Sequence, residues 1–321
     1  MADLIRLVKG SSLRVRVPAS SANIGPGFDS IGLALGIWDE CVATVTAEPG
    51  LSIDVVGEGG ADVPRDARHL VHRSMVRAWE QLGVKPPAGL RLSCRNAIPH
   101  GRGLGSSASA IVAGIVAAQG LCDMAMGRDR ADNSVDFAFT NNLATAIEGH
   151  PDNASASVFG GMTLSWADDV DSGQIHSVQL EVTADVIPLL FIPATQLPTA
   201  TARAVLPEQI PHCVAAQNSA RVGLLVEAVT RRPDLLLAAT REWLHQEQRR
   251  SFFQTRWRCW ISFAAKDMRP SSQVPGPACS SSPRRRRSRA PELWATSPYG
   301  GCSLPGCRLR APASSGSRPE Y

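Results

Sequence analysis

The sequence predicts an α+β fold, and three observations lead to that prediction. Residues 13–58 alternate apolar and polar positions and are rich in Val, Ile and Thr, which is typical of strands. A helical spacing of apolar residues follows, and beyond it helices and strands are mixed. Strands first and mixed elements afterwards favour an α+β arrangement. With 321 residues, the chain is long enough for two modest domains or one large one.

The first elements are four strands and two helices. Strands are predicted at “LRVRVPAS”, “CVATVTAE”, “LSIDVVGE” and “GLRLSCRNAIP”, with turn residues between the first three. Apolar residues recur at helical spacing over “ARHLVHRSMVRAWEQLG”, and Gly83 ends that helix. The small, apolar run from Ser106 predicts a buried helix, to which the last of these strands leads through a glycine-rich loop.

The remaining elements are predicted with less regular patterns. A helix is expected over “SVDFAFTNNLATAIEG”, and strand and turn over “NASASVFGGMTLSW”. The apolar composition of “DVIPLLFIPA” predicts a buried strand. The long segment from Cys213 predicts two helices broken at Arg232 and Pro233.

Composition narrows the class of protein. A hydrophobic content of 44% and a charged content of 19% are ordinary for a soluble globular protein. No stretch approaches ~18–20 uninterrupted apolar residues, and “MADLIRLVKGSS” lacks the pattern of a signal peptide. The eight cysteines follow no repeating spacing, which indicates reduced thiols. We therefore expect a cytoplasmic protein without a membrane span.

Charge divides the chain into two unlike parts. Residues 250–321 contain 13 basic and 3 acidic residues, a net charge of +10, whereas residues 1–249 contain 20 basic and 26 acidic residues, a net charge of −6. Nine prolines fall within those last 72 residues, and no helical or strand period is maintained there. The composition predicts a disordered, basic tail.

Three polar motifs carry candidate chemistry, and the first is the loop in “AIPHGRGLGSSASAIVAG”. Gly101, Gly103 and Gly105 let backbone N–H groups converge on an anion, and a helix start adds unpaired N–H groups and a positive dipole end. The serines offer hydroxyls to phosphate or Mg²⁺. The spacing matches neither a Walker A loop nor GxGxxG. Taken alone, the loop also fits a turn that caps a buried helix.

The second motif is “PASSANIGPGFDSIGLAL”, in which Asn23 and Asp29 lie in a loop between apolar runs. A polar pair on a rigid turn can grip the hydroxyl or amine of a small substrate. The alternative is a turn in which both side chains bond only local backbone.

The third motif, “AIEGHPDNASASVFGG”, places Glu148, His150, Asp152 and Asn153 within six residues. So many polar groups need partners or a ligand if they are buried. Glu148 at a helix end suits Mg²⁺, whereas one His among carboxylates lacks the ligand set of zinc. A solvated polar loop is the alternative.

Together the motifs are far more specific than any one of them. “PASSANxGPGFDxxGLAL”, “PxxxGLGSSAS” and “EGHPDNAS” resemble the GHMP kinase superfamily, and “PTATARAVLP” (198–207) resembles the substrate-side motif of its homoserine kinase family. The resemblance extends from about Val15 to Arg249. It implies an N-terminal ribosomal-protein-S5-like domain at 1–165, an incomplete ferredoxin-like C-terminal domain at 166–249, and a tail at 250–321.

The resemblance also implies an activity, which is ATP-dependent phosphorylation of the side-chain hydroxyl of L-homoserine, a step toward threonine. The ATP phosphates would be wrapped by Pro99, His100, Gly101, Arg102, Gly103, Leu104, Gly105, Ser106, Ser107, Ala108 and Ser109. Ser106 or Ser107 with Glu148 would hold Mg²⁺. Thr199 would lie near the γ-phosphate, and homoserine would be bound by Asn23, Asp29, His150, Asp152, Asn153, Arg203 and Arg249.

The chemistry of two of these roles, carboxylate binding by arginine and substrate orientation by Asp29, can be stated. Arg203 and Arg249 match guanidinium groups that clamp the substrate carboxylate, a task that suits the planar, bidentate fork of Arg. Asp29 is assigned to substrate orientation first, and proton acceptance is a hypothesis, since positioning and charge stabilisation dominate phosphoryl transfer. The resemblance leaves open whether the chain forms a homodimer, as is common in the enzymes that it resembles.

The resemblance ends abruptly after “LHQEQRR”. The family's second glycine-rich segment, Ser-Gly-Ala-Gly-Pro, is absent, and its nearest trace is “VPGPACSSSP” (274–283). A shifted reading frame near codon 250 is the simplest hypothesis, and loss of the C-terminal elements would leave apolar core surface exposed. The rival readings are another GHMP kinase with a different alcohol substrate, and an inactive domain whose “SPRRRRSRAP” run binds nucleic acid without sequence preference.

Overall fold

The computed structural model describes residues 5–128, 135–169, 173–193 and 196–253, and the backbone of two short strands at 261–265 and 308–310. The strands are β1 (Ser12–Ala22), β2 (Ile31–Val45), β3 (Gly50–Gly57), β4 (Gly89–Asn96), β5 (Met162–Ala167), β6 (Ile175–Leu180), β7 (Val186–Leu190), β8 (Ile261–Ala265) and β9 (Arg308–Arg310). The helices are α1 (Leu70–Gln81), α2 (Ser106–Ala125), α3 (Phe137–Glu148), α4 (Pro151–Phe159), α5 (Thr199–Ala204), α6 (His212–Thr230) and α7 (Leu236–Ala239).

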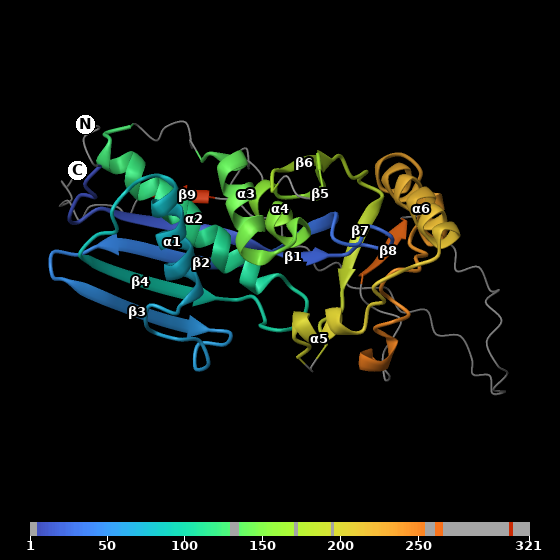
Figure 1. The fold of residues 1–321 in the computed structure, drawn as a ribbon, viewed down its shortest axis with the longest axis horizontal. Coiled ribbons are helices and arrows are strands. Elements are labelled where there is room, and N and C mark those ends of the chain that lie inside the picture. Colours follow the sequence, from blue (N-terminus) through green and yellow to red (C-terminus); the bar gives the residue numbers. More distant parts are fainter. Residues whose placement is uncertain are drawn as a thin grey trace, which may run out of the picture.

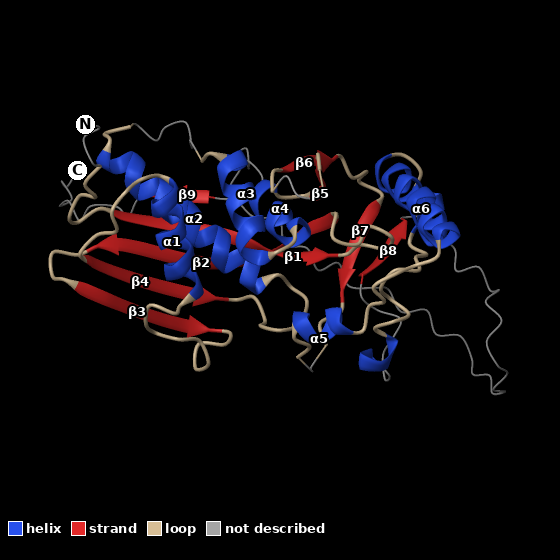
Figure 2. Ribbon diagram, viewed as in Figure 1, coloured by secondary structure: helices blue, strands red, loops and turns tan. Residues whose placement is uncertain are grey.

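One large sheet carries the first half of the molecule, with strands in the order β3-β4-β2-β1-β9 (Figure 1). The strands β1, β2 and β4 pair antiparallel, whereas β3 and β4 are parallel and α1 forms the crossover between them. Strand β5 pairs with the first residues of β2 and with β6. Helices α1 to α4 lie on one face of this sheet (Figure 2), which confirms the predicted α+β class.

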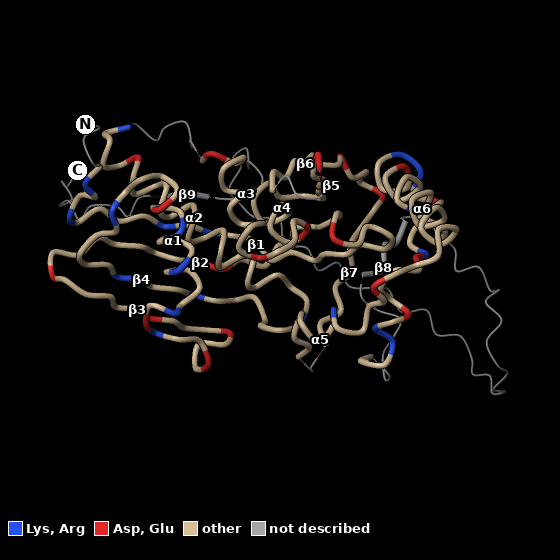
Figure 3. Tube along the Cα trace, in the orientation of Figure 1, with Lys and Arg blue, Asp and Glu red and all other residues tan. Residues whose placement is uncertain are grey.

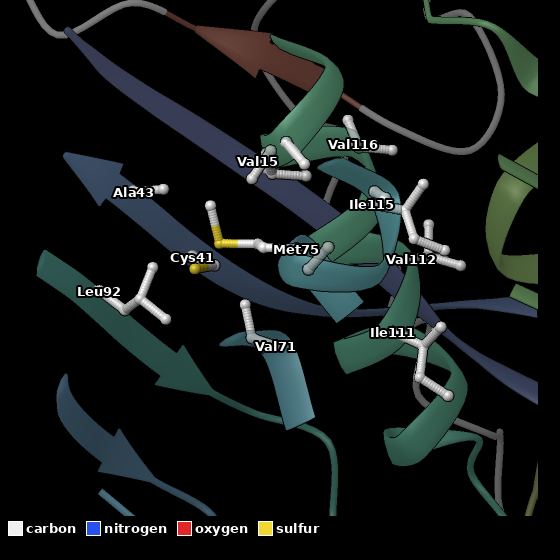
Figure 4. Close-up of a cluster of buried hydrophobic side chains, with 14 of the residues drawn as sticks. Val15, Cys41, Ala43, Val71, Met75, Leu92, Ile111, Val112, Ile115 and Val116 are labelled. Carbon is white, nitrogen blue, oxygen red and sulfur yellow. The ribbon is translucent and has the colours of Figure 1, made fainter. Parts of the chain in front are cut away.

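The main core lies between that sheet and α1 and α2. Val15, Cys41 and Leu92 point from three neighbouring strands toward Met75 on α1 and Ile115 on α2 (Figure 4), and all five are buried. Buried residues alternate along the first half of β1 and recur at helical spacing along α1, as the sequence pattern predicted. This packed unit fixes the sheet edge from which the glycine-rich loop leaves.

Helix α2 has unusually uniform apolarity because almost every face of it is covered. Within the described residues it is the one helix long and apolar enough to span a membrane, yet 78% of its most apolar window is buried inside the protein. Gly114 makes its closest approach to α1, since a Cβ there would lie 2.4 Å from the carbonyl oxygen of Val71. The apolar composition is thus accounted for by helix–helix and helix–sheet packing.

The segment “NASASVFGGMTLSW” was predicted to be strand and turn, and the first part of that prediction is wrong. Residues 151–159 form helix α4, with Pro151 at its first position and Asp152 in its first turn, and the strand begins only at Met162. Pro at the helix start and an acidic residue near the N-terminal dipole both favour this helix. Asp152 and Asn153 therefore lie on a helix rather than in a loop.

The apolar run around β7 was predicted to be a buried strand, and the strand is confirmed but its burial is not. Only Val186 is buried, whereas Ile187, Leu189, Phe191 and Ile192 are exposed. Strand β7 pairs with β8 in a separate two-stranded sheet. Val186 packs with α6 residues in an apolar cluster, whereas the side chains of Ile187 and Leu189 stay exposed.

The two helices predicted in the second half are also only partly observed. Helix α6 ends at Thr230 as expected, but after Pro233 a 3-10 turn leads into the single turn of α7. Helix α5 and strand β6 had no predicted counterpart. Strands β8 and β9 lie in the tail, where no regular element was expected, and the segments 274–283 and “SPRRRRSRAP” lie outside the described residues.

A second apolar cluster joins the two halves of the chain. It combines Ile31 of β2 and Met162 of β5 with Leu225 and Val229 of α6 and Leu236 of α7. The cluster therefore draws on both sides of the predicted boundary after residue 165. Figure 3 shows basic and acidic positions interspersed along the described trace.

Candidate active site

The glycine-rich loop connects β4 to α2 and is held in a left-handed backbone. Gly101, Gly103 and Gly105 have φ values of 66°, 73° and 65°, which L side chains rarely adopt. Gly105 is the N-cap of α2 and supplies no side-chain acceptor. The first N–H groups of α2 are thus left for an external acceptor at the positive end of the helix dipole.

Gly105 is also fixed by close packing from two other elements. A Cβ there would lie 2.2 Å from Ser20 Oγ on β1 and 2.9 Å from Asn153 Oδ1 on α4. Ser20 Oγ donates to Asn153 Oδ1 at 2.9 Å, and the Ser20 N–H donates to the carbonyl of Leu104 at 3.1 Å. The loop therefore lies directly against the third motif, and Asn153 lies beside it.

The serines of the loop do not all face the same way. Ser106 is half-buried and Ser107 is exposed, and Ser107 Oγ donates to Glu148 Oε1 at 2.5 Å. Ser109 is fully buried, and its hydroxyl lies 3.5 Å from the carbonyl of Val17 under the loop. The expectation that the Ser109 hydroxyl is offered to phosphate is therefore wrong, because that side chain faces the sheet. Leu104 and Ala108 are buried as well.

A residue that sequence reasoning missed anchors the start of the loop. Asp39 of β2 accepts hydrogen bonds from the N–H groups of Ala97 and Ile98 at 2.7 and 3.0 Å. Burial raises the pKa of Asp39, although these two bonds act in the opposite direction. Farther along, Gly101 accepts from the Leu197 N–H at 2.8 Å, which ties the loop to the segment before α5.

The second motif forms the connection between β1 and β2. Asn23 and Asp29 adopt φ values of 57° and 52°, an uncommon conformation for residues other than glycine. Asn23 Oδ1 accepts a hydrogen bond from the Asp29 N–H at 2.9 Å. The Asn23 side chain thus bonds local backbone, as in the alternative hypothesis of a turn stabilised by its own side chains. This bond holds the left-handed backbone at Asn23 and at Asp29. Strained backbone of this kind clusters at functional sites.

Asp29, in contrast, reaches across the chain to the fourth motif. Its carboxylate pairs in a bidentate manner with Arg203 of α5, at 3.0 Å to Nη1 and 2.5 Å to Nη2. These hydrogen bonds to Asp29 raise the pKa of Arg203. Each side chain of the pair is about one-third exposed, at 33% for Arg203 and 34% for Asp29, so both remain accessible from solution.

The third motif presents a buried His–Asp pair at the start of α4. His150 Nδ1 lies 2.8 Å from Asp152 Oδ1, which also accepts from the Asn153 N–H at 2.7 Å. Burial opposes protonation of His150, but the hydrogen bond and charge of Asp152 outweigh it and raise the pKa of His150. Asp152 is 0% exposed, and its Oδ2 atom has no hydrogen-bond partner within the described residues.

Asp29, His150 and Asp152 bring one ligand atom each to within 4.8 Å of one another. Arg203 already pairs with Asp29, and His150 already pairs with Asp152. A metal ion bound through the paired atoms would have to displace both pairs. The two pairs satisfy most of the charge on these side chains within the protein itself.

Two further predicted residues flank this cluster. Thr199 is exposed at the first position of α5, one turn before Arg203. Arg249 is 8% exposed, and its Nε donates to the carbonyl of Ala202 on the same helix at 3.0 Å. Burial and the neighbouring charge of Arg203 lower the pKa of Arg249. The second, third and fourth motifs, far apart in the sequence, thus meet in one polar site, and Asn153 of the third motif lies beside the glycine-rich loop.

Comparisons with known proteins agree with this architecture. A family model described as the GHMP kinases N terminal domain matches residues 69–161. A homoserine kinase of Streptomyces coelicolor is 50% identical over 241 residues, which cover 75% of this chain and 74% of the relative. A homoserine kinase of Mycobacterium tuberculosis is 47% identical over 234 residues, which cover 73% of this chain and 72% of the relative.

Solved structures show the same relationship. The homoserine kinase of Cytophaga hutchinsonii matches with a TM-score of 0.63 and 26% identity, over 78% of this chain and 77% of that chain. The phosphomevalonate kinase of Streptococcus pneumoniae shares the fold, with a TM-score of 0.53 at 12% identity, over 72% of this chain and 77% of that chain. The fold is that of the GHMP kinase class.

Within that class, the chain belongs to the homoserine kinase family. The family resemblance of the sequence motifs is thereby confirmed.

Proposed function

We propose that this chain transfers the γ-phosphoryl group of ATP to the side-chain hydroxyl of L-homoserine and releases O-phospho-L-homoserine, a step toward threonine, in the cytoplasm. The observation that supports this most directly is the meeting of Asp29 with Arg203, 174 residues apart, beside a glycine-rich helix start. A phosphate-binding loop next to a site with both anionic and cationic groups suits a zwitterionic amino-acid substrate.

The loop from Pro99 to Gly105 and the start of α2 would bind the ATP phosphates. Three glycines in left-handed backbone allow close approach of the main chain, and the free N–H groups of α2 face the anion. Asp39 holds the backbone just before the loop, and the bond from Ser20 to Leu104 holds its far end, so little order has to be gained on binding. Arg102 donates to the carbonyl of Pro193, which adds a third tie.

The residues present also fit Mg²⁺. Ser107 and Glu148 bring a hydroxyl and a carboxylate oxygen together at the mouth of the loop, and hard oxygen ligands are those that Mg²⁺ prefers. Ser106 is the neighbouring hydroxyl. When bound with ATP, the ion would neutralise charge on the phosphate oxygens. In the protein alone, the Ser107–Glu148 hydrogen bond keeps both groups in place.

On the substrate side, Arg203 and Arg249 would pair with the carboxylate of homoserine, and His150, Asp152 and Asn153 would line the rest of the pocket. Asp152 keeps one carboxylate oxygen without a partner in a fully buried position, which is costly unless a ligand donates to it. The amine or hydroxyl of an amino alcohol supplies such a donor.

Asp29 is proposed to orient the substrate, and its role as a base is the part most open to test. In the structure its carboxylate is occupied by Arg203 rather than free to accept a proton. Asp29→Asn is expected to retain turnover within about 10²-fold of the parent, since a positioned base contributes about 10²–10⁴-fold. Complete loss of turnover with unchanged L-homoserine binding would instead make Asp29 the essential base.

The decisive experiment is ATP-dependent phosphorylation of L-homoserine by this chain, beside a version with residues 250–321 restored to the other reading frame. Turnover by the restored protein alone supports the site and assigns the defect to the tail. Turnover by neither contradicts the proposed substrate. Mevalonate and galactose as acceptors in the same assay test the second candidate, another GHMP kinase, which the shared fold with phosphomevalonate kinase favours.

A further inference from the structure

Phe28, which precedes Asp29 in the second motif, lies at the centre of the substrate-side cluster without belonging to the core. The Arg203 guanidinium carbon lies over its ring at 5.4 Å from the centroid, and that of Arg249 lies over it at 5.5 Å. Phe28 is only partly buried and is a member of none of the three apolar clusters in the described chain. Core packing therefore does not explain this aromatic side chain.

The ring itself is held by a buried histidine. His245 stacks on Phe28 with ring centroids 5.4 Å apart and an interplanar angle of 29°. His245 Nε2 lies 2.9 Å from the carbonyl of Gly25, and because a carbonyl only accepts, Nε2 carries the hydrogen. Glu242 fixes the turn that carries His245 by accepting from the N–H groups of residues 244–246. The stacked His245 ring thus fixes the orientation of Phe28.

Burial lowers the pKa of His245, which disfavours a third positive charge beside the two guanidinium groups. Burial is the main cause of the lowered pKa of Arg249, and repulsion by the neighbouring Arg203 guanidinium lowers it further. Asp29 neutralises Arg203, while Arg249 is buried, and within the described residues no carboxylate forms an ion pair with it. Two neighbouring guanidinium groups need another source of stabilisation, and the negative face of an aromatic ring provides one.

We infer that Phe28 is a positioning residue that holds Arg203 and Arg249 side by side so that both can pair with a single substrate carboxylate. The inference rests on the proposed function only in taking this carboxylate to be that of L-homoserine. It assigns to Phe28 an electrostatic and geometric role in substrate affinity rather than a role in phosphoryl transfer. Loss of the ring should therefore raise the KM for L-homoserine and leave the KM for ATP and kcat nearly unchanged.

The first test does not depend on substrate. In the full chain, side-chain NMR signals of Arg203 and Arg249, assigned by Arg→Lys variants, should show upfield ring-current shifts that disappear in Phe28→Leu and persist in Phe28→Tyr. Phe137→Leu is the control, because Phe137 stacks on another aromatic ring, that of Phe159, at 5.9 Å and is exposed. Within the described residues no arginine lies over its ring. Unshifted arginine signals in the parent chain would overturn the inference.

The second test measures binding of L-homoserine by calorimetry and steady-state kinetics on the same proteins. Cation–π contacts of this kind correspond to factors of roughly 2 to 30 in affinity, so Phe28→Leu is expected to bind L-homoserine about tenfold more weakly. Phe28→Tyr should recover most of that loss, and Phe137→Leu should show none. Equal affinities of the parent and Phe28→Leu would overturn the inference. A parent that shows the ring-current shifts but binds no L-homoserine would refute the proposed substrate and leave the arginine arrangement standing.

Discussion

Gly105→Ala tests whether the phosphate-binding loop depends on its contact with the substrate side of the site. Gly105 begins α2 at a φ of 65°, and an added Cβ would lie 2.2 Å from Ser20 Oγ and 2.9 Å from Asn153 Oδ1. Gly127, just after the other end of the same helix, has a φ of 63°, and an added Cβ there meets nothing within 4 Å. The two substitutions share the same backbone cost and differ in the collision.

The magnitude follows from these distances. A left-handed Ala costs about 1 kcal/mol or somewhat more at either position. At Gly105 the buried Ser20 hydroxyl must also move, which disrupts its hydrogen bonds to Asn153 and Ser157 at a cost of about 1–3 kcal/mol. We expect Gly105→Ala to lower the free energy of unfolding by about 3 kcal/mol, against about 1 kcal/mol for Gly127→Ala.

Urea unfolding of the two variants measures that difference, and binding of a non-hydrolysable ATP analogue measures its consequence. Gly105→Ala should bind the analogue at least about tenfold more weakly because the start of α2 is displaced, whereas Gly127→Ala should bind it as the parent does. Equal destabilisation by both substitutions would show that the contact with Ser20 and Asn153 relaxes without cost. Unchanged analogue binding by Gly105→Ala would refute the assignment of this loop to ATP.

Three further predictions concern separate features. Glu148→Gln should lower kcat by about 10²-fold or more and raise the Mg²⁺ concentration for half-maximal rate, whereas the exposed Glu80→Gln should change neither; equal Mg²⁺ dependence would contradict the metal assignment. The pKa of His150 is raised by its pairing with Asp152, so this pairing stabilises the protein fully below about pH 6.5 and less as the pH rises through the folded-state pKa. The loss of stability in His150→Gln, measured by urea unfolding, should therefore be larger at pH 6 than at pH 8. Leu189→Lys, on the exposed face of β7, should reduce binding of a hydrophobic dye with a stability change within about 0.5 kcal/mol; unfolding would show that the strand is covered in solution.

Much of the site could be predicted because its chemistry is concentrated in short motifs. Glycines before a helix start, and carboxylates next to a histidine, point to phosphate and polar ligands from residue type alone. The sequence could not show that the Asn23 side chain bonds local backbone while Asp29 reaches Arg203, because both alternatives suit the same turn. It also could not show that Ser109 faces the sheet, since that depends on the rotation of α2.

The residues that sequence reasoning missed act through tertiary contacts. Asp39 alternates along a strand like any solvent-facing acid, and only the pairing of β2 with β4 brings it to the start of the loop. In the sequence Phe28 is an ordinary apolar residue, and only the fold brings Arg203 and Arg249 over its ring. One signal was available and overlooked, because Pro151 followed by Asp152 is a typical helix start.

The distribution of these contacts indicates which part of the activity depends on the second half of the chain. The phosphate loop is fixed by β1, β2 and α4, which belong to the well-packed sheet unit. Arg203 lies instead on α5, and Arg249 lies after α7, at the point where the family pattern stops. A change confined to residues after 249 should therefore weaken the carboxylate clamp before it weakens ATP binding. Measured separately, the affinities for L-homoserine and for an ATP analogue distinguish a damaged clamp from a globally unfolded protein, since global unfolding would abolish both.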